Sequence, residues 1–293
     1  MRRGEELHGG AAILGLAMMI ASEAATLAGV KVFAQWNTPI CWTGFILFAD
    51  GLVRRRRGSS WLTSAPREFV GLALASIGLW LVFEFYNLFL HNWHYVGLPA
   101  RRAVRLFGYA WAFATIWPAI FEAAELIGVW RGPASPARAA RPARPAFAAV
   151  SMAAGAAMLV SPLVVSPAVA HYLAAPVWLG FIFLLDPINA RLGAESLTGD
   201  FARGRHDRFW NLILAGFLCG GLWEFWNYWS IAKWHYTVPI MADVRIFEMP
   251  VPGYFGFPPF ALECFTMYVF VRAVAVRLAG AAGSGRAGRT IGL

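Results

Sequence analysis

The chain carries the same polar residues twice, in the same order, inside two sets of apolar segments. Residues 42–50 return at 178–186, and Glu84 with Asn87 returns as Glu224 with Asn227. The other repeated elements are Trp93-His94-Tyr95 with Trp234-His235-Tyr236, Pro99 with Pro239, Val104-Arg105-Leu106-Phe107 with Val244-Arg245-Ile246-Phe247, and Pro118 and Glu122 with Pro259 and Glu263. The offset stays between 136 residues (178 against 42) and 141 residues (263 against 122). An internal duplication explains this pattern, and it constrains both halves to one fold.

Apolar runs long enough to cross a membrane recur along both halves. The composition is 59% hydrophobic and only 14% charged, which is not that of an ordinary soluble domain. Runs of roughly 20 apolar residues are typical of membrane spans. The predicted spans are 10–32, 36–53, 68–90, 106–130, 147–172, 174–190, 209–232 and 254–277. The sequence therefore predicts an all-α integral membrane protein with eight transmembrane helices.

The basic residues predict the orientation of these spans. If the N-terminus is cytoplasmic and the spans alternate, cytoplasmic segments hold 19 of the 25 Lys and Arg, and the outer side holds six. That bias indicates a bacterial-type inner (plasma) membrane protein with both termini in the cytoplasm. It also accounts for the net charge of +9, so a nucleic-acid partner is not expected. Because four spans per half is an even number, the halves are expected to be parallel repeats.

The organisation follows from these spans. Residues 1–130 form the first four-span repeat, and residues 147–277 form the second. Between them, 131–146 is rich in Pro and Arg and is expected to be a cytoplasmic linker. Residues 278–293 are expected to be a loose tail. The first span fills the same place in its half as 147–172 does in the other, so it is interpreted as structure and not as a signal peptide.

Eight acidic residues fall inside predicted spans. A charged side chain near the bilayer centre costs about 2.5–3.5 kcal/mol on insertion scales, so these acids are expected to face the bundle interior. Asp50 and Asp186 lie near cytoplasmic span ends, where capping or pairing with loop arginines is expected. The other six are Glu23, Glu84, Glu122, Glu125, Glu224 and Glu263.

Helical spacing predicts a pocket in each half. Glu224 and Asn227 are three residues apart and share a helix face, as Glu84 and Asn87 do. Prolines and glycines between 250 and 259 delay the last span until about residue 258, so Glu263 is expected near its start. The predicted pocket gathers Glu224, Asn227, His235 and Glu263, with a counterpart made by Glu84, Asn87, His94 and Glu122, and with Arg105 and Arg245 at its mouth.

Several elements allow a second interpretation. Trp93 and Trp234, with the tyrosines two residues on, are typical of an aromatic belt at a membrane surface. For His94 and His235 a belt role and a site role both stay open. Asn87 and Asn227 could bond helices together and nothing more. No nucleotide-binding loop, metal-ligand spacing or nucleophile elbow is present, so neither a metal nor a cofactor is expected, and Cys41, Cys219 and Cys264 are interpreted as packing residues.

The order of these motifs resembles the membrane domains of heterodimer-type and fungal-type lycopene cyclases. In that family an acidic-aromatic helix end is followed by a Trp-x-Tyr loop, a Gly-containing stretch and a Pro-Glu helix start. The matching elements are Glu224 to Asn227, Trp234 to Tyr236, Gly253, and Pro259 to Glu263, with Glu84 to Asn87, Trp93 to Tyr95, Gly108, and Pro118 to Glu122 in the first half. The Pro-to-Glu spacing is four here and two in the family. The resemblance implies a helix bundle that acts on a long polyene or prenyl lipid by protonating a double bond without a redox change.

The leading hypothesis is a membrane enzyme, of cyclase or isomerase type, for an isoprenoid, carotenoid or other lipidic substrate. Glu122 and Glu263 would donate the proton, while Glu84 and Glu224 stabilise the carbocation and Asn87 and Asn227 orient them. Arg105 and Arg245 would hold an anionic head group. A proton-coupled transporter and a structural or assembly subunit remain alternatives, and the protein could form homo- or hetero-oligomers.

Overall fold

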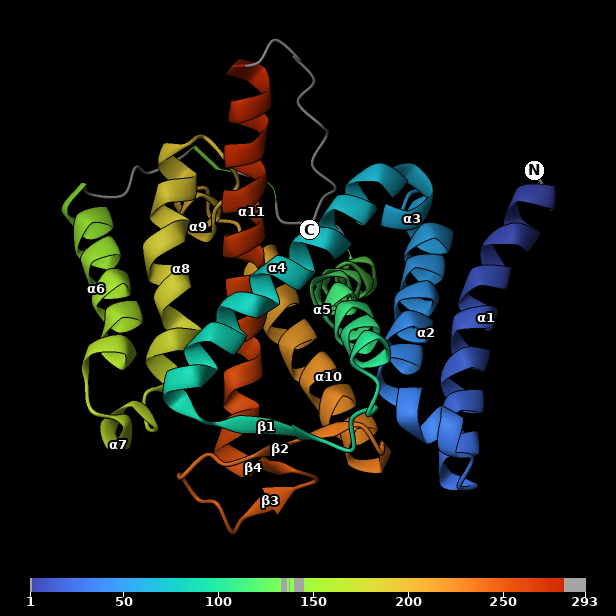
Figure 1. Cartoon of the computed structure of the whole chain (residues 1–293). Coiled ribbons are helices and arrows are strands. Elements are labelled where there is room, and N and C mark those ends of the chain that lie inside the picture. Colours follow the sequence, from blue (N-terminus) through green and yellow to red (C-terminus); the bar gives the residue numbers. More distant parts are fainter. Residues whose placement is uncertain (1, 133–135, 137, 140–144, 282–293) are drawn as a thin grey trace.

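The structure, a computed structural model, describes residues 2–132, 136, 138–139 and 145–281 (Figure 1). Within that part of the chain it is helical, with two short strand pairs. The first half contains α1 (Arg2–Leu27), α2 (Lys31–Arg57), α3 (Trp61–Ser64), α4 (Pro66–Leu90), β1 (Trp93–Val96) and α5 (Arg102–Arg131). The second half contains α6 (Pro145–Val164), α7 (Pro167–Ala170), α8 (Ala174–Arg191), α9 (Leu197–Ala202), α10 (Asp207–Trp229), β2 (Lys233–Tyr236), β3 (Arg245–Ile246), β4 (Met249–Pro250), the 3₁₀ helix η1 (Val251–Gly256) and α11 (Phe257–Ala281).

Each predicted span corresponds to one long helix, but many boundaries differ by several residues, and two helices end well before the predicted residue. The span predicted over 10–32 ends at Leu27, because Gly29 takes a left-handed conformation with φ of 77° and turns the chain into α2. The span predicted over 147–172 ends at Val164, and the chain restarts as α7 at Pro167. A proline disfavours helical conformation in the residue before it, which explains that break. The late start predicted for the last span is confirmed, since α11 begins at Phe257.

Among the residues that the structure describes, five helical segments are long and apolar enough to cross a membrane. They are Gly10–Leu27, Pro66–Leu90, Arg102–Arg131, Ala146–Val164 and Val251–Ala279. The helices α2, α8 and α10 are interrupted by polar residues such as Asn37, Asp186 and Asn211, which lowers their mean hydropathy. Large apolar side chains are exposed along α1, α4 and α6, among them Ile13, Leu74 and Val150. Such surfaces are expected of helices that face lipid.

Helix contacts follow the same scheme in both halves. In the first half α1 packs on α2, α2 on α5, and α4 on α5, and in the second half α6 packs on α8, α8 on α11, and α10 on α11. The contacts between halves match only in part: α4 touches α6 as α10 touches α1, but α10 packs broadly on α5 while α4 touches α11 only slightly. Figure 1 shows the α1–α2 and α6–α8 pairs at opposite edges, with α4, α5, α10 and α11 between them.

Matching glycines bring the edge helices together. A Cβ at Gly15 would lie 2.3 Å from the carbonyl oxygen of Gly44, so α1 and α2 touch backbone to backbone. A Cβ at Gly155 would lie 2.7 Å from the carbonyl oxygen of Gly180 and 2.4 Å from the amide nitrogen of Leu184, which joins α6 to α8 in the same manner. Small residues that allow close backbone approach are typical of helix packing in membranes.

The two halves meet in a strand pair that crosses one end of the bundle (Figure 1). β1 and β2 are antiparallel, with Trp93 opposite Tyr236, His94 opposite His235 and Tyr95 opposite Trp234. No pattern in the sequence predicted these strands. They form because each helix end is followed by a short loop whose backbone groups need partners, and the matching loop of the other half supplies them.

Asn87 and Asn227 fasten these strands to the helices before them. The side-chain amide of Asn87 donates to the carbonyl of Trp93 (2.8 Å) and accepts from the amide of the same residue (3.3 Å). Asn227 makes the matching pair with Trp234, at 2.9 and 3.0 Å. The repeated asparagines therefore hold the strand pair in place.

Asp50 and Asp186 cap the short helices at the other end of the bundle. Asp50 Oδ1 accepts the amide hydrogen of Leu62 in α3 at 2.9 Å. Asp186 accepts the amide hydrogens of Leu197 (2.6 Å) and Thr198 (2.9 Å) in α9. Carboxylates accepting amide hydrogens at a helix start satisfy donors that lack a partner within the helix. The sequence left capping and pairing with loop arginines open for Asp50 and Asp186, and in the structure both residues cap helices.

Part of the predicted linker and tail lies outside the described residues. These positions are 133–135, 137 and 140–144 of the linker 131–146 and 282–293 of the tail 278–293.

Candidate functional site

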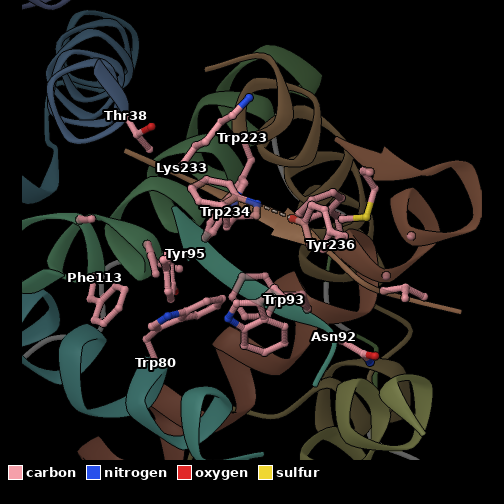
Figure 2. Close-up of a pocket in the computed structure, with 18 of the residues that line it drawn as sticks. Thr38, Trp80, Asn92, Trp93, Tyr95, Phe113, Trp223, Lys233, Trp234 and Tyr236 are labelled. Carbon is pink, nitrogen blue, oxygen red and sulfur yellow. Dashed lines mark hydrogen bonds between the residues drawn. The ribbon is translucent and has the colours of Figure 1, made fainter. Parts of the chain in front are cut away.

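A cavity of about 430 Å³ lies beside the β1–β2 pair. Helices of both halves line it, each with an aromatic side chain, and the strands close it on one side (Figure 2). The lining helices contribute Trp42 from α2, Trp80 from α4, Phe113 from α5, Trp178 from α8, Trp223 from α10 and Phe260 from α11. The rings pack against one another across the halves, as Trp80 and Trp223 do with centroids 5.7 Å apart. An apolar cavity with few polar groups is the usual form of a site for a small apolar ligand.

Strand geometry divides the repeated Trp-His-Tyr element. Successive side chains of a strand point to opposite faces. Trp93, Tyr95, Trp234 and Tyr236 accordingly line the cavity, on the face toward the helices. The two histidines take the other face: His94 is exposed, His235 is partly exposed, and their rings lie 5.9 Å apart. The tryptophans and tyrosines are therefore cavity residues, and the histidines are not.

Glu84 lies behind this aromatic wall and collects three hydrogen bonds on one oxygen. Its Oε1 accepts from the indole N–H of Trp80 (2.9 Å), the indole N–H of Trp93 (3.2 Å) and the hydroxyl of Tyr95 (2.5 Å). All three donors also line the cavity.

Glu224 makes the equivalent contact in the second half, with fewer donors. Its Oε1 accepts the hydroxyl of Tyr236 at 2.7 Å, and that hydroxyl in turn accepts the indole N–H of Trp234 at 2.8 Å (Figure 2). Its Oε2 is buried without a hydrogen-bond partner, and the residue is 0% exposed. The duplicated pairs Tyr95–Glu84 and Tyr236–Glu224 thus lie at the same cavity. The Glu84 carboxyl group accepts three hydrogen bonds, and the Glu224 carboxyl group accepts one.

The two repeated arginines are not equivalent in space. Arg105, in the first turn of α5, lines the cavity, and its Nη1 donates to the carbonyl of Pro99 at 3.5 Å. Arg245 lies on β3, exposed, and its Nε donates to the carbonyl of Ala242 at 2.6 Å. Arg245 lies outside the lining, which corrects the prediction of two arginines at one mouth. The cause is the hairpin β3–β4 and η1, which take the place of a first helical turn in the second half.

Lys233 is the other basic residue of the lining, and it is paired. Its Nζ lies 2.7 Å from Glu248 Oε1, and His235 Nδ1 lies 2.8 Å from Glu248 Oε2. Burial raises the pKa of Glu248, but the hydrogen bonds from Lys233 and His235 outweigh it and lower that pKa below its ordinary value of 4.5. The charge of Lys233 is therefore compensated within the protein.

Glu122 and Glu263 are buried in the helix core, outside the cavity lining. Glu122 is 1% exposed beside Asp50 and Glu125, and Glu263 is 0% exposed beside Tyr86. The carboxyl oxygens of both lack hydrogen-bond partners. The pockets expected from the sequence, with Glu224, Asn227, His235 and Glu263 or with Glu84, Asn87, His94 and Glu122, are not formed. Spacing along the chain predicts which residues share a face of one helix. It does not predict how one helix is rotated against another, and that rotation decides which side chains meet.

The sequence interpretation missed the role of the tyrosines and of Trp80. The sequence pattern places Tyr95 and Tyr236 in an aromatic belt, and only the strand pairing in the structure separates them from the histidines. Trp80 precedes Glu84 by one helical turn, and that spacing indicates a hydrogen bond between them. The residue of the second half that corresponds to Trp80 is Gly220, so the internal duplication does not mark Trp80 as a site residue.

Over the described residues, no group of three or more His, Cys, Asp or Glu side chains is arranged to hold a metal ion. Comparison of the chain with protein-family models, curated proteins and solved structures found no significant match.

Proposed function

We propose that the chain is an inner-membrane protein of eight spans, built as two parallel four-helix repeats with both termini in the cytoplasm. The proposal is supported by the matching helix contacts of the halves, by the glycine contacts at Gly15 and Gly155, and by the capping carboxylates Asp50 and Asp186. The distribution of Lys and Arg supports the orientation. Reporter fusions in the segment 131–146 and in the tail after residue 281 should both give cytoplasmic signals, and an outer signal from either would reject this topology.

We further propose that the cavity binds an isoprenoid-like lipid and that the protein moves a double bond in it by acid catalysis. The carrying observation is that two Tyr–Glu pairs, one from each half, abut a single cavity walled by aromatic rings. Aromatic faces attract cations, so these rings stabilise a carbocation formed from the substrate. No redox cofactor is needed, because a proton is added at one carbon and removed from another.

The unequal hydrogen bonding of the two pairs gives them different roles. Glu224, with one donor and a buried free oxygen, holds the proton. The Tyr236 hydroxyl gives its own proton to a double bond and takes the proton of Glu224 in its place, so the hydrogen bond that Tyr236 donates in the structure reverses during the transfer. Glu84, with three donors, is the carboxylate that stabilises the cation and takes a proton from the neighbouring carbon through Tyr95. The bond shift leaves the substrate's composition unchanged, and proton exchange resets the pair. In this scheme Glu122 and Glu263 are no longer the donors.

Deuterium labelling tests this assignment. Purified protein is incubated in D₂O with an isoprenoid lipid extract, and lipids that gain deuterium at carbon are found by mass spectrometry. The wild type should label an isoprenoid, and Glu224→Gln should lower the labelling rate by about 10²–10⁴. Glu263→Gln should keep it near wild type. Loss in Glu263→Gln alone would return the donor role to Glu263, and no labelling by the wild type would reject the enzyme.

A proton-coupled carrier is the second candidate, and one observation favours it. Glu122 and Glu263 are fully buried carboxyl groups without hydrogen-bond partners, and such acids in membrane helices mark proton pathways in carriers. Proteoliposomes containing a pH-sensitive dye would detect proton flux on addition of an isoprenoid lipid extract. Flux lost in Glu122→Gln and Glu263→Gln, without deuterium labelling, would favour the carrier over the enzyme.

A further inference from the structure

We infer that the lipid bound in the cavity carries one acidic head group, a phosphate or a carboxylate, and that Arg105 binds it. This inference rests on the proposed function, since it names the class of substrate for the same cavity. The geometry points to it through three observations: the place of Arg105, the absence of a compensating acid, and the difference between the two halves.

Arg105 is a charge at the edge of an aromatic site. Its side chain is only partly exposed and lines the cavity together with Trp36, Gly108 and Tyr109. Within the described part of the chain, its guanidinium makes one hydrogen bond, a long contact from Nη1 to the carbonyl of Pro99 at 3.5 Å. Four of its five N–H donors thus remain available, in a planar fork that matches the oxygens of a phosphate or carboxylate.

No acidic side chain in the described part of the chain forms an ion pair with Arg105. Glu84, the repeated acid of α4, uses its Oε1 on Trp80, Trp93 and Tyr95. Lys233, the other lining cation, is paired with Glu248. Partly desolvating an arginine without a counter-ion is costly, so a bound anion is the expected partner.

The second half offers no such charge, although its sequence contains the matching arginine. Arg245 lies on the exposed hairpin β3–β4 and is outside the lining. In the second half, the cavity wall is made by α11 and η1. Their lining residues are Phe257, Pro259 and Phe260 of α11 and Pro252, Gly253 and Phe255 of η1. Among the described residues, the cavity therefore has an unpaired cation only where the first half lines it, and the part lined by η1 and the start of α11 is apolar, although the two Tyr–Glu pairs are duplicated.

A cavity of this form suits a ligand with one charged end and one apolar chain. The apolar chain lies among the rings, and the head group reaches Arg105 near the hydroxyl of Tyr109, a second donor at that end. A neutral polyene or an alcohol would leave the guanidinium uncompensated. Phosphate and carboxylate share the chemistry that the arginine recognises, and the binding experiment separates them.

The test uses three probes with the same isoprenoid chain: farnesyl phosphate, farnesoic acid and farnesol. Binding to the purified full-length protein in detergent is measured by quenching of tryptophan fluorescence, for the wild type, Arg105→Gln and Arg105→Lys. Arg245→Gln is the matched control, because it removes the duplicated arginine that lies away from the cavity. The wild type should bind at least one of the acidic probes about 10- to 100-fold more tightly than farnesol.

Arg105→Gln should abolish that preference while farnesol binding stays unchanged, and Arg105→Lys should keep part of it, because a lysine retains the charge without the planar fork. Arg245→Gln should behave as the wild type. If phosphate alone is preferred, the head group is a phosphate; if both acids are, it is any compact anion. Equal binding of all three probes, or an equal loss in Arg105→Gln and Arg245→Gln, would overturn the inference and leave the proposed function intact. Failure to bind any probe would overturn both.

Discussion

Replacing Gly155 by alanine should loosen the α6–α8 pair, because the backbone of α8 occupies the place of the added methyl group. The new Cβ would lie 2.4 Å from the amide nitrogen of Leu184 and 2.7 Å from the carbonyl oxygen of Gly180. Relief to an ordinary carbon contact, about 3.5 Å, requires the helices to separate by roughly 1 Å. Backbone atoms cannot change rotamer, so the whole helix must move. Overpacking of this kind costs about 1–3 kcal/mol.

The matched control is Gly71→Ala in α4, where nothing lies within 4 Å of the added Cβ. There the substitution should be neutral or stabilise by up to about 1 kcal/mol, because alanine favours helix over glycine. The free energy of unfolding is measured in detergent micelles by SDS titration, followed by circular dichroism. If Gly155→Ala is as stable as Gly71→Ala, the close contact of α6 and α8 is wrong. Gly15→Ala should repeat the loss at α1–α2, since Gly15 lies equally close to Gly44.

Three further outcomes are expected. Asn227→Leu should lose about 1–3 kcal/mol of unfolding free energy, measured by the same titration, because it removes both hydrogen bonds that hold Trp234. Asp186→Ala should lose about 0.5–2 kcal/mol through the cap of α9, and an unchanged midpoint would reject that role. The lowered pKa of Glu248 means that its stabilisation is full above 4.5 and is lost as pH falls through its folded value. Glu248→Gln should therefore remove part of the acid-induced loss of stability below about pH 4.5, and an unchanged pH profile would contradict the ion pairs.

Apolar runs predicted the long helices, and the prolines and glycines between 250 and 259 predicted the late start of α11, because both act locally. The duplication selected Glu84, Glu224, Asn87 and Asn227, each of which has the same kind of contact in both halves. The prediction that residues of separate helices converge on one pocket was wrong. The depth and rotation of a helix depend on its contacts with other helices, such as those of Gly15 and Gly155, and these cannot be predicted from residue spacing within one helix.

The strands show a second limit of the sequence. A segment of four residues is too short for its alternation to be distinguished from a loop, and its partner lies in the other half of the chain. Only after the pairing is known do Trp93 and Tyr95 separate from His94. The difference between Arg105 and Arg245 has the same origin, since identical local sequences are placed on a helix in one half and on a hairpin in the other.

The register of β1 and β2 has an evolutionary consequence. The central pair joins His94 to His235, its own duplicate, and each flanking tryptophan faces the tyrosine of the other copy. A self-complementary ladder of this kind is what two identical subunits form around a twofold axis. A half-length ancestor could therefore have made the same ladder as a homodimer, with one cavity shared between the subunits. Fusion of the two genes then allowed the copies to diverge, so that a single arginine at the cavity edge distinguishes one end of a ligand from the other.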